Sequence, residues 1–273
     1  TVGFDAVEMI PTEWRWPATV VRLSADPTPC PVSRPATEAV GPLEQLLPEL
    51  TAALAANPGA SSWTEAEVAA ARDASHQRVL ASWTPAGVNP TQAVQQLVNS
   101  FPSAAFSVDA GAHMFAATLA LAHEGAQRCS ISNGLATMGY ALPAAVGMTY
   151  AEPERPAVAI TGDGGLSMCL TELETAVRSG HRLVLFLLND AQLSLIKIKQ
   201  EAKGHEPRGV GYGPTDWPSI AAGFGARAYQ ATTAAELGSA LAEAASHAAG
   251  VDFIEVVIAQ GGYAGLMETV RGK

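Results

Sequence analysis

Acidic and amide side chains end two apolar stretches of this sequence, in positions that suit a divalent cation. One stretch ends in TGDGG (161–165) and another in NDAQ (189–192). Carboxylate and amide oxygens are ligands that Mg²⁺ prefers, usually together with phosphate oxygens. A glycine-rich turn before a helix commonly cradles phosphate with backbone N–H groups, but the carboxylate of Asp163 would repel a phosphate. The two segments therefore predict that Asp163 and Asp190 hold a metal ion, which in turn binds the phosphate.

A third loop belongs with these two, because it also follows an apolar strand. It runs from Asp109 to His113. Each feature also has a structural interpretation. Gly-Asp-Gly is often only a turn, Asn-Asp is common turn chemistry, Asp109 could be a helix N-cap, and a lone histidine is usually structural. Three such loops at the ends of strands favour a site over coincidence.

Strands and helices alternate from about residue 90 onwards. We expect strands at 105–108, 157–160, 183–188, 227–229 and 253–258, and helices at 91–100, 114–123, 170–179, 217–223 and 234–248. A glycine-rich turn at 132–139 should lead into an alanine-rich helix that ends near residue 150. Continuous apolar strands that alternate with helices indicate a parallel sheet covered on both faces. The fold class is thus α/β, a doubly wound parallel sheet whose ligands bind at the carboxyl ends of the strands.

The first 85 residues do not make a complete domain. We expect strands at 6–10 and 19–23, a proline-rich loop, a helix at 43–56 that Pro48 kinks or splits, and a helix from Thr64 to about residue 80. Thr64 and Glu67 have the spacing of a capping box. We therefore divide the chain into residues 1–85, a partial α/β segment with a linker, and residues 86–273, the doubly wound domain with a C-terminal tail.

Composition excludes several classes of partner. The formal net charge is −10, which argues against nucleic acid and anionic membrane surfaces. Apolar residues make up 48% of the chain, but no apolar run is long enough to cross a bilayer, and the N-terminal residues lack the basic region of a signal peptide. The three cysteines lack metal-site spacing and are expected to be reduced thiols of a cytoplasmic protein.

The order and spacing of the motifs resemble those of thiamine-diphosphate enzymes of the acetolactate synthase branch. Gly162-Asp163-Gly164 followed by Asn189-Asp190 resembles that family's Gly-Asp-Gly and Asn-Asn motif. "SNGLATMGYALPAAVG" (132–147), "DAGAHMF" (109–115) and "DWPSIAAGFGA" (216–226) resemble further segments of the same branch. The likeness covers roughly residues 90–260 and, more faintly, the segment before them, which implies that residues 1–85 are a partial α/β middle domain with a linker.

The resemblance implies thiamine diphosphate and Mg²⁺ as cofactors and assigns roles by position. Asp163, Asp190 and the backbone carbonyl of Gln192 would bind the metal. Met138 would be the apolar wedge that bends the cofactor, and the Ala136 carbonyl would accept a hydrogen bond from its aminopyrimidine, so these two are the expected catalytic residues. The full expected cofactor-binding set is Asp109, Gly111, His113, Ala136, Met138, Gly162, Asp163, Gly164, Gly165, Asp190, Gln192, Leu193, Ser194 and Leu195.

The sequence departs from the family pattern in three ways. Asp190 replaces the second Asn, which predicts tighter metal binding and a weaker hold on diphosphate. Ile196 stands where simple 2-keto acid decarboxylases carry a glutamate proton donor, which favours joining of two carbonyl compounds over simple decarboxylation. The family's activating glutamate, carried on a pyrimidine-binding domain, has no counterpart before Asp109, since Glu8, Glu13, Glu38 and Glu44 lie in the wrong context.

The missing glutamate leads to two interpretations. In the first, the chain is one subunit of a hetero-oligomeric enzyme that makes or breaks C–C bonds of 2-keto acids or aldehydes, and a partner chain supplies the pyrimidine-binding domain; a piece of one longer chain would look the same. In the second, it is a non-catalytic cofactor-binding or regulatory subunit. A Rossmann-type nucleotide-binding protein is disfavoured, because the segment at Gly162 lacks G-x-G-x-x-G. Lys197, Lys199 and Lys203 could hold an acidic substrate group or form a solvated helix face.

Overall fold

The structure is a computed structural model, and it describes residues 2–3, 18–27, 35–59, 62–125, 128–132 and 134–270. The strand expected at 6–10, together with Glu8, Glu13 and Cys30, lies outside these residues. The chain divides into two compact units, Thr1–Val68 and Ala69–Lys273. That the first unit belongs to a middle domain, and that a boundary lies near residue 85, stay predictions.

In its described residues, the first unit contains a pair of parallel strands and one complete helix. Strand β1 (Val21–Ser24) pairs with β2 (Thr37–Val40), and Arg22 lies opposite Glu38, with 3.5 Å between the charged groups. Helix α1 (Leu43–Ala56) continues through Pro48, so the proline does not split it. At the end of this unit Thr64 and Glu67 exchange the expected capping contacts, at 2.8 and 3.2 Å, and α2 (Glu65–Ala81) begins there.

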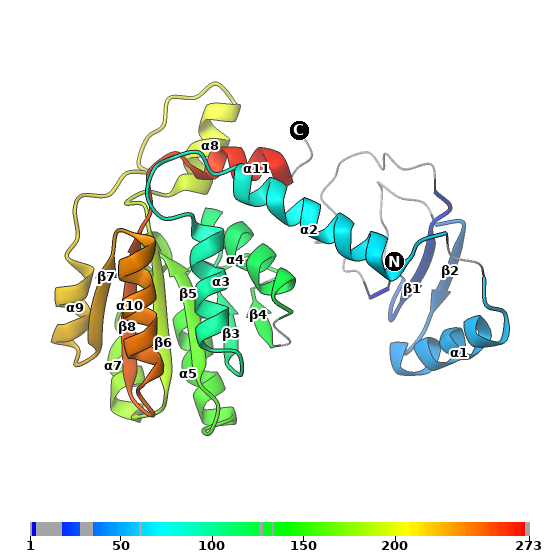
Figure 1. The fold of residues 1–273 in the computed structure, drawn as a ribbon, viewed down its shortest axis with the longest axis horizontal. Helices are drawn as coiled ribbons and strands as arrows, with labels where there is room; N and C mark the ends of the chain where they lie inside the picture. Colours follow the sequence, from blue (N-terminus) through cyan, green and yellow to red (C-terminus); the bar gives the residue numbers. More distant parts are fainter. Residues whose placement is uncertain are drawn as a thin grey trace. The chain divides into compact units, whose positions relative to one another are not determined.

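The second unit is built on a six-stranded sheet with the order β4-β3-β5-β6-β8-β7. Every neighbouring pair is parallel (Figure 1). The strands are β3 (Ala105–Val108), β4 (Cys129–Ile131), β5 (Ala157–Gly162), β6 (Leu183–Asn189), β7 (Arg227–Ala231) and β8 (Val251–Val257). The doubly wound parallel sheet expected from the sequence is confirmed.

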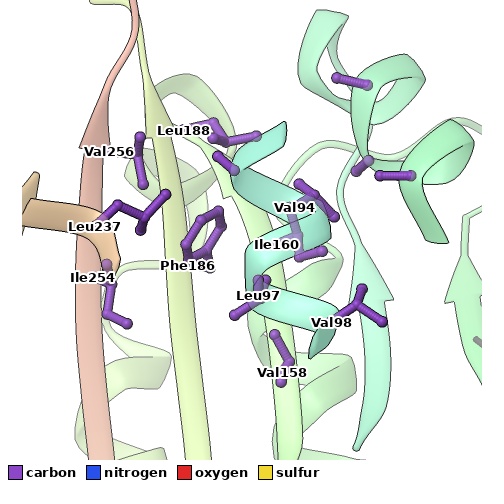
Figure 2. Packing of buried hydrophobic residues seen from close by; sticks show 14 of the residues in the cluster. Val94, Leu97, Val98, Val158, Ile160, Phe186, Leu188, Leu237, Ile254 and Val256 are labelled. Carbon is purple, nitrogen blue, oxygen red and sulfur yellow. The ribbon is translucent and has the colours of Figure 1, made fainter. Parts of the chain in front are cut away.

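Helices cover both faces of this sheet. Successive strand residues point to opposite sides, so the buried strands present apolar side chains on both faces. The helices that follow α2 are α3 (Pro90–Ser100), α4 (Ala112–His123), α5 (Ala141–Ala151), α6 (Asp163–Cys169), α7 (Glu172–Ser179), α8 (Ser194–Ala202), α9 (Trp217–Gly223), α10 (Ala234–Ala245) and α11 (Tyr263–Val270). On one face Val158, Ile160 and Phe186 pack against α3 and α10, as Figure 2 shows. On the other face, intervening residues such as Ala159 and Leu185 pack against α5, α7 and α9.

Several elements differ from the sequence expectation. Strands β2 and β4 and helices α8 and α11 were not expected, and they are short elements of three to nine residues. The expected helix 170–179 is α7, and a separate helix, α6, precedes it because the chain turns helical at Asp163 itself. In the part of the chain that the structure describes, no helix combines the length and apolar character needed to span a bilayer.

Candidate cofactor site

The direction in which the sheet is wound reverses between β3 and β5. The chain passes from β3 to the edge strand β4 and then returns to β5 on the other side of β3. In open α/β sheets, ligands bind in the crevice at the carboxyl ends of the strands where such a reversal occurs. The segments 109–113 and 163–165 follow β3 and β5, and 190–193 follows the adjacent β6.

A cavity of about 220 Å³ opens at this edge of the sheet. All expected cofactor-binding residues except Asp109 line it: Gly111, His113, Ala136, Met138, Gly162, Asp163, Gly164, Gly165, Asp190, Gln192, Leu193, Ser194 and Leu195. Ala110, Ala112, Met114, Leu188, Ile196, Lys199 and Tyr263 complete the lining. The fold thus brings the three loops together, and their contact with a cofactor stays a prediction.

Asp109 lies behind the cavity and joins its walls. Its carboxylate is fully buried and accepts hydrogen bonds from the backbone N–H groups of Gly139 (3.0 Å) and Tyr140 (2.9 Å) and from the hydroxyl of Thr161 (2.8 Å). Gly139 and Tyr140 directly precede α5, where a negative charge is favourable. Asp109 therefore links β3, β5 and the Met138 segment, and its expected contact with a cofactor stays a prediction.

The glycines around Asp163 are required by close packing. A β-carbon on Gly165 would lie 1.9 Å from the Asp109 carboxylate, and one on Gly162 would lie 2.8 Å from the His113 ring. A β-carbon on Gly164 would lie 2.5 Å from Leu193. No side chain fits at these three positions without displacing the opposite wall.

His113 is buried beside these glycines and is uncharged at neutral pH. Burial lowers its pKa to about 4, although the neighbouring Asp109 acts in the opposite direction. Its Nε2 atom is buried and has no hydrogen-bond partner within the described residues. A neutral imidazole that lines the cavity can offer this nitrogen to a ligand.

Asp163 and Asp190 are two buried carboxylates that lie close enough to influence each other. Burial, together with the charge of Asp190, raises the pKa of Asp163 to about 7. Burial also raises the pKa of Asp190, while the hydroxyl of Ser194, which donates to this carboxylate, lowers it. The Oδ2 atom of Asp163 is buried without a partner in the described structure. A divalent cation would satisfy this oxygen and offset the repulsion between the carboxylates.

The backbone between the two expected ligands of the second loop is strained. Ala191, between Asp190 and Gln192, has a φ of 54°, in the left-handed region that alanine rarely adopts. The segment is held by the chain around residue 211: Leu193 N–H donates to the Val210 carbonyl (2.7 Å), and Tyr212 N–H donates to the Ala191 carbonyl (2.9 Å). Strained backbone of this kind concentrates at functional sites.

Asn189 points away from the cavity, although its amide oxygen was expected to be available at the site. Its Nδ2 donates to the buried Glu255 (2.7 Å), and its Oδ1 accepts from the N–H of Ala191 (2.9 Å). Glu255 therefore holds Asn189, and Asn189 holds the strained residue between the expected metal ligands. Sequence reasoning missed Glu255 because an acidic residue inside an apolar strand has no local motif that connects it to a loop.

The two expected catalytic residues, Ala136 and Met138, line the same cavity as the expected metal ligands. Ala136 has a φ of 48°, so it is also in the left-handed region, and Met138 lies within 3.1 Å of the β-carbon position of Gly164. Of the lysines considered, Lys199 lines the cavity, while Lys197 donates to the side-chain oxygen of Gln192 (3.3 Å) and Lys203 ends α8 in solvent.

The donors present fit a hard cation bound together with a phosphate ligand. Among the described residues no cluster of three or more His, Cys, Asp or Glu side chains could form a complete metal site. Two carboxylates and a backbone carbonyl leave the remaining positions to water and ligand oxygens, which is the coordination Mg²⁺ usually adopts with phosphates.

Residues 109–256 match the family described as thiamine pyrophosphate enzyme, C-terminal TPP binding domain. The chain belongs to this family. It is 31% identical to the catabolic acetolactate synthase of Raoultella terrigena over 252 residues, which are 86% of this chain and 43% of that enzyme. It is 30% identical over 151 residues to the acetolactate synthase of Bacillus subtilis strain 168, covering 55% of this chain and 26% of the relative.

Another relative is the putative thiamine pyrophosphate-containing protein YdaP of the same Bacillus strain, 38% identical over 114 residues, or 42% of this chain and 20% of that protein. The chain therefore spans less than half the length of these relatives. This chain thus corresponds to the C-terminal portion of a thiamine pyrophosphate enzyme of the acetolactate synthase-like branch.

Proposed function

We propose that this chain is the diphosphate- and metal-binding part of an acetolactate synthase-like enzyme that uses thiamine diphosphate and Mg²⁺ to make or break a C–C bond next to a carbonyl. The main support for this proposal is the buried Oδ2 atom of Asp163, which has no hydrogen-bond partner in the described structure. It lies at the winding reversal, beside a second buried carboxylate, in a cavity lined by the expected cofactor-binding residues. A buried carboxylate without a partner is costly unless a ligand completes it.

Each wall of the cavity has a defined part in holding the cofactor. Asp163, Asp190 and the Gln192 carbonyl would bind Mg²⁺, and the neutral His113 would face the diphosphate. Met138 would support the bent cofactor, and Ala136 would offer its carbonyl to the aminopyrimidine. The cofactor supplies a carbon nucleophile that also takes up the electron pair of the broken bond. Apolar lining residues such as Leu188 and Leu193 keep water away from this chemistry.

The substrate end of the cavity lies near the start of α8. Ile196 and Lys199 line the cavity there. An apolar side chain at 196 offers no proton to the reacting carbon, so the proposed reaction is the joining of a 2-keto acid with a second carbonyl compound. Lys199 is the positively charged residue of the described lining, and we propose that it attracts the substrate carboxylate.

A partner surface is required to complete the site. The cavity of about 220 Å³ is smaller than the roughly 300–1,000 Å³ of sites that enclose a ligand. Its described lining contains two carboxylates, both aspartates, and so no candidate for the activating glutamate. Beside it Leu135 is 90% exposed and Met168 is 63% exposed, and α5 carries no charged residue. An uncharged surface next to an open site fits a pyrimidine-binding domain, which we propose is supplied by a second chain or by another part of a longer chain.

The missing glutamate also motivates the alternative, a non-catalytic cofactor-binding or regulatory subunit. The native mass of the assembly purified from its own host, with every chain identified, separates the two. A second polypeptide that carries the pyrimidine-binding domain, and an assembly that turns over 2-keto acids with thiamine diphosphate and Mg²⁺, supports the enzyme. A homo-oligomer of this chain that binds the cofactor without turnover refutes the enzyme and favours the binding subunit.

A further inference from the structure

Tyr263 is a cavity-lining residue that neither the sequence motifs nor the family match assigns. It lies beyond the matched residues 109–256, at the start of α11. The side chain is 2% exposed, and its hydroxyl is buried without a hydrogen-bond partner in the described structure. A buried hydroxyl without a partner is costly, so its presence on a cavity wall calls for a ligand that completes it.

The hydroxyl lies close to the expected metal ligands and stays protonated. Burial raises its pKa well above the ordinary value, and the charges of Asp190 and Asp163 act in the same direction. Neither carboxylate forms a hydrogen bond with it. Tyr263 therefore presents a neutral O–H donor in the cavity that Asp163 and Asp190 also line.

Close packing fixes the orientation of this ring. Trp83 contacts Tyr263 edge to face, with 5.4 Å between ring centroids and an interplanar angle of 73°. Gly262 and Gly265 allow this approach, because β-carbons there would lie 2.3 Å from Trp83 and 2.6 Å from the Ser82 carbonyl oxygen. The hydroxyl is thus held in place before any ligand binds, which lowers the entropic cost of using it.

Helix α11 connects the loops of the site. It packs against α4 and α8, and Figure 1 shows it beside α8. His113 lies in the first turn of α4, and α8 follows the loop of Asp190. The C-terminal helix therefore contacts the elements that position both loops, and Tyr263 projects from it into the space that they enclose.

We propose that the Tyr263 hydroxyl donates a hydrogen bond to an anionic oxygen of the metal-bound diphosphate. The inference rests on the proposed cofactor and extends the site to a residue of α11. The two carboxylates of the cavity wall do not serve this donor, because the hydroxyl forms no hydrogen bond with either of them in the described structure. An oxygen of the metal-bound diphosphate would supply the acceptor that no described residue provides for this hydroxyl.

Tyr263→Phe tests the proposal, because it removes the hydroxyl and keeps the ring on Trp83. Affinities for thiamine diphosphate, for inorganic pyrophosphate and for thiamine, each with Mg²⁺, are measured by titration calorimetry on the full chain with any copurifying partner retained. We expect the variant to bind thiamine diphosphate and pyrophosphate about tenfold more weakly, as for the loss of a hydrogen bond to a charged group. Thiamine binding should not change. Tyr150→Phe, at an exposed ring 4.8 Å from His181, is the control.

The outcomes separate the inference from the proposed function. Equal pyrophosphate affinity in Tyr263→Phe and in the unmodified protein overturns the inference and leaves the cofactor intact. Failure of the unmodified protein to bind thiamine diphosphate and pyrophosphate overturns both. The ligand-free variant should unfold at the same temperature or higher, because an unpartnered hydroxyl has been removed. A fall in that temperature together with faster proteolysis of α11 would show a purely structural role and would also overturn it.

Discussion

Replacement of Asp163 by asparagine should stabilise the metal-free protein. The carboxyl group has a pKa of about 7 in the fold, compared with 3.8 for the free group. At about 1.4 kcal/mol per pKa unit, this difference corresponds to a destabilisation of about 4 kcal/mol at pH 8, where the group is ionised in both states. Asparagine removes the charge and keeps an acceptor for the backbone N–H groups of Gly164 and Gln192. We expect a gain of about 2–4 kcal/mol, or roughly 5–10 °C in Tm.

The sign of the pH dependence follows from the raised pKa. Between pH 3.8 and about 7 the folded state binds a proton that the unfolded state has released, so stability falls as the pH rises through this range. The assay is urea unfolding in EDTA at pH 6 and pH 8. Asp163→Asn should be the more stable form at pH 8, and its advantage should shrink at pH 6. Addition of Mg²⁺ with thiamine diphosphate should then stabilise the unmodified protein only. A variant that is less stable than the unmodified protein at pH 8 without metal would refute the electrostatic argument.

Three further changes test other parts of the site. Asp190→Asn should weaken Mg²⁺ binding and strengthen diphosphate binding in calorimetric titrations, and two unchanged affinities would contradict the charge argument. Gly165→Ala should cost about 3 kcal/mol or more in thermal unfolding, because its β-carbon has no space, whereas Gly147→Ala on the open face of α5 should be neutral or stabilising by up to about 1 kcal/mol. Glu255→Gln should lower Mg²⁺ affinity several-fold by loosening Asn189, with equal affinity counting against a positioning role.

The sheet was predictable because its signal is repeated along the chain. The apolar runs of β5 and β6 are long and buried on both faces, and α9 begins and ends as expected. The elements that were missed are short or depend on distant partners. Strand β4 is three residues long at the sheet edge, and α11 is fixed by packing on Trp83. Local sequence carries little information about either.

The candidate site was also predictable only in part, in its positions but not in the orientation of its side chains. Positions that the motif spacing predicts, such as His113 and Asp163, line the cavity. The orientation of individual side chains was not predictable, because it depends on partners far along the chain. Asp109 turns toward Gly139, Tyr140 and Thr161, and Asn189 turns toward Glu255 on β8.

Two different constraints act on the Gly-Asp-Gly-Gly segment: packing requires its glycines, and ligand binding requires its aspartate. Gly162 and Gly165 leave space for His113 and Asp109 whether or not a ligand is present, so the fold itself preserves them. Asp163 is the opposite case, since without a metal it only weakens the protein. In a homologue that had lost cofactor binding, we expect the aspartate to be the first residue of the motif to be substituted, while the glycines remain. Retained glycines therefore indicate only that the fold is preserved, whereas a retained aspartate between them indicates that metal and cofactor binding is preserved.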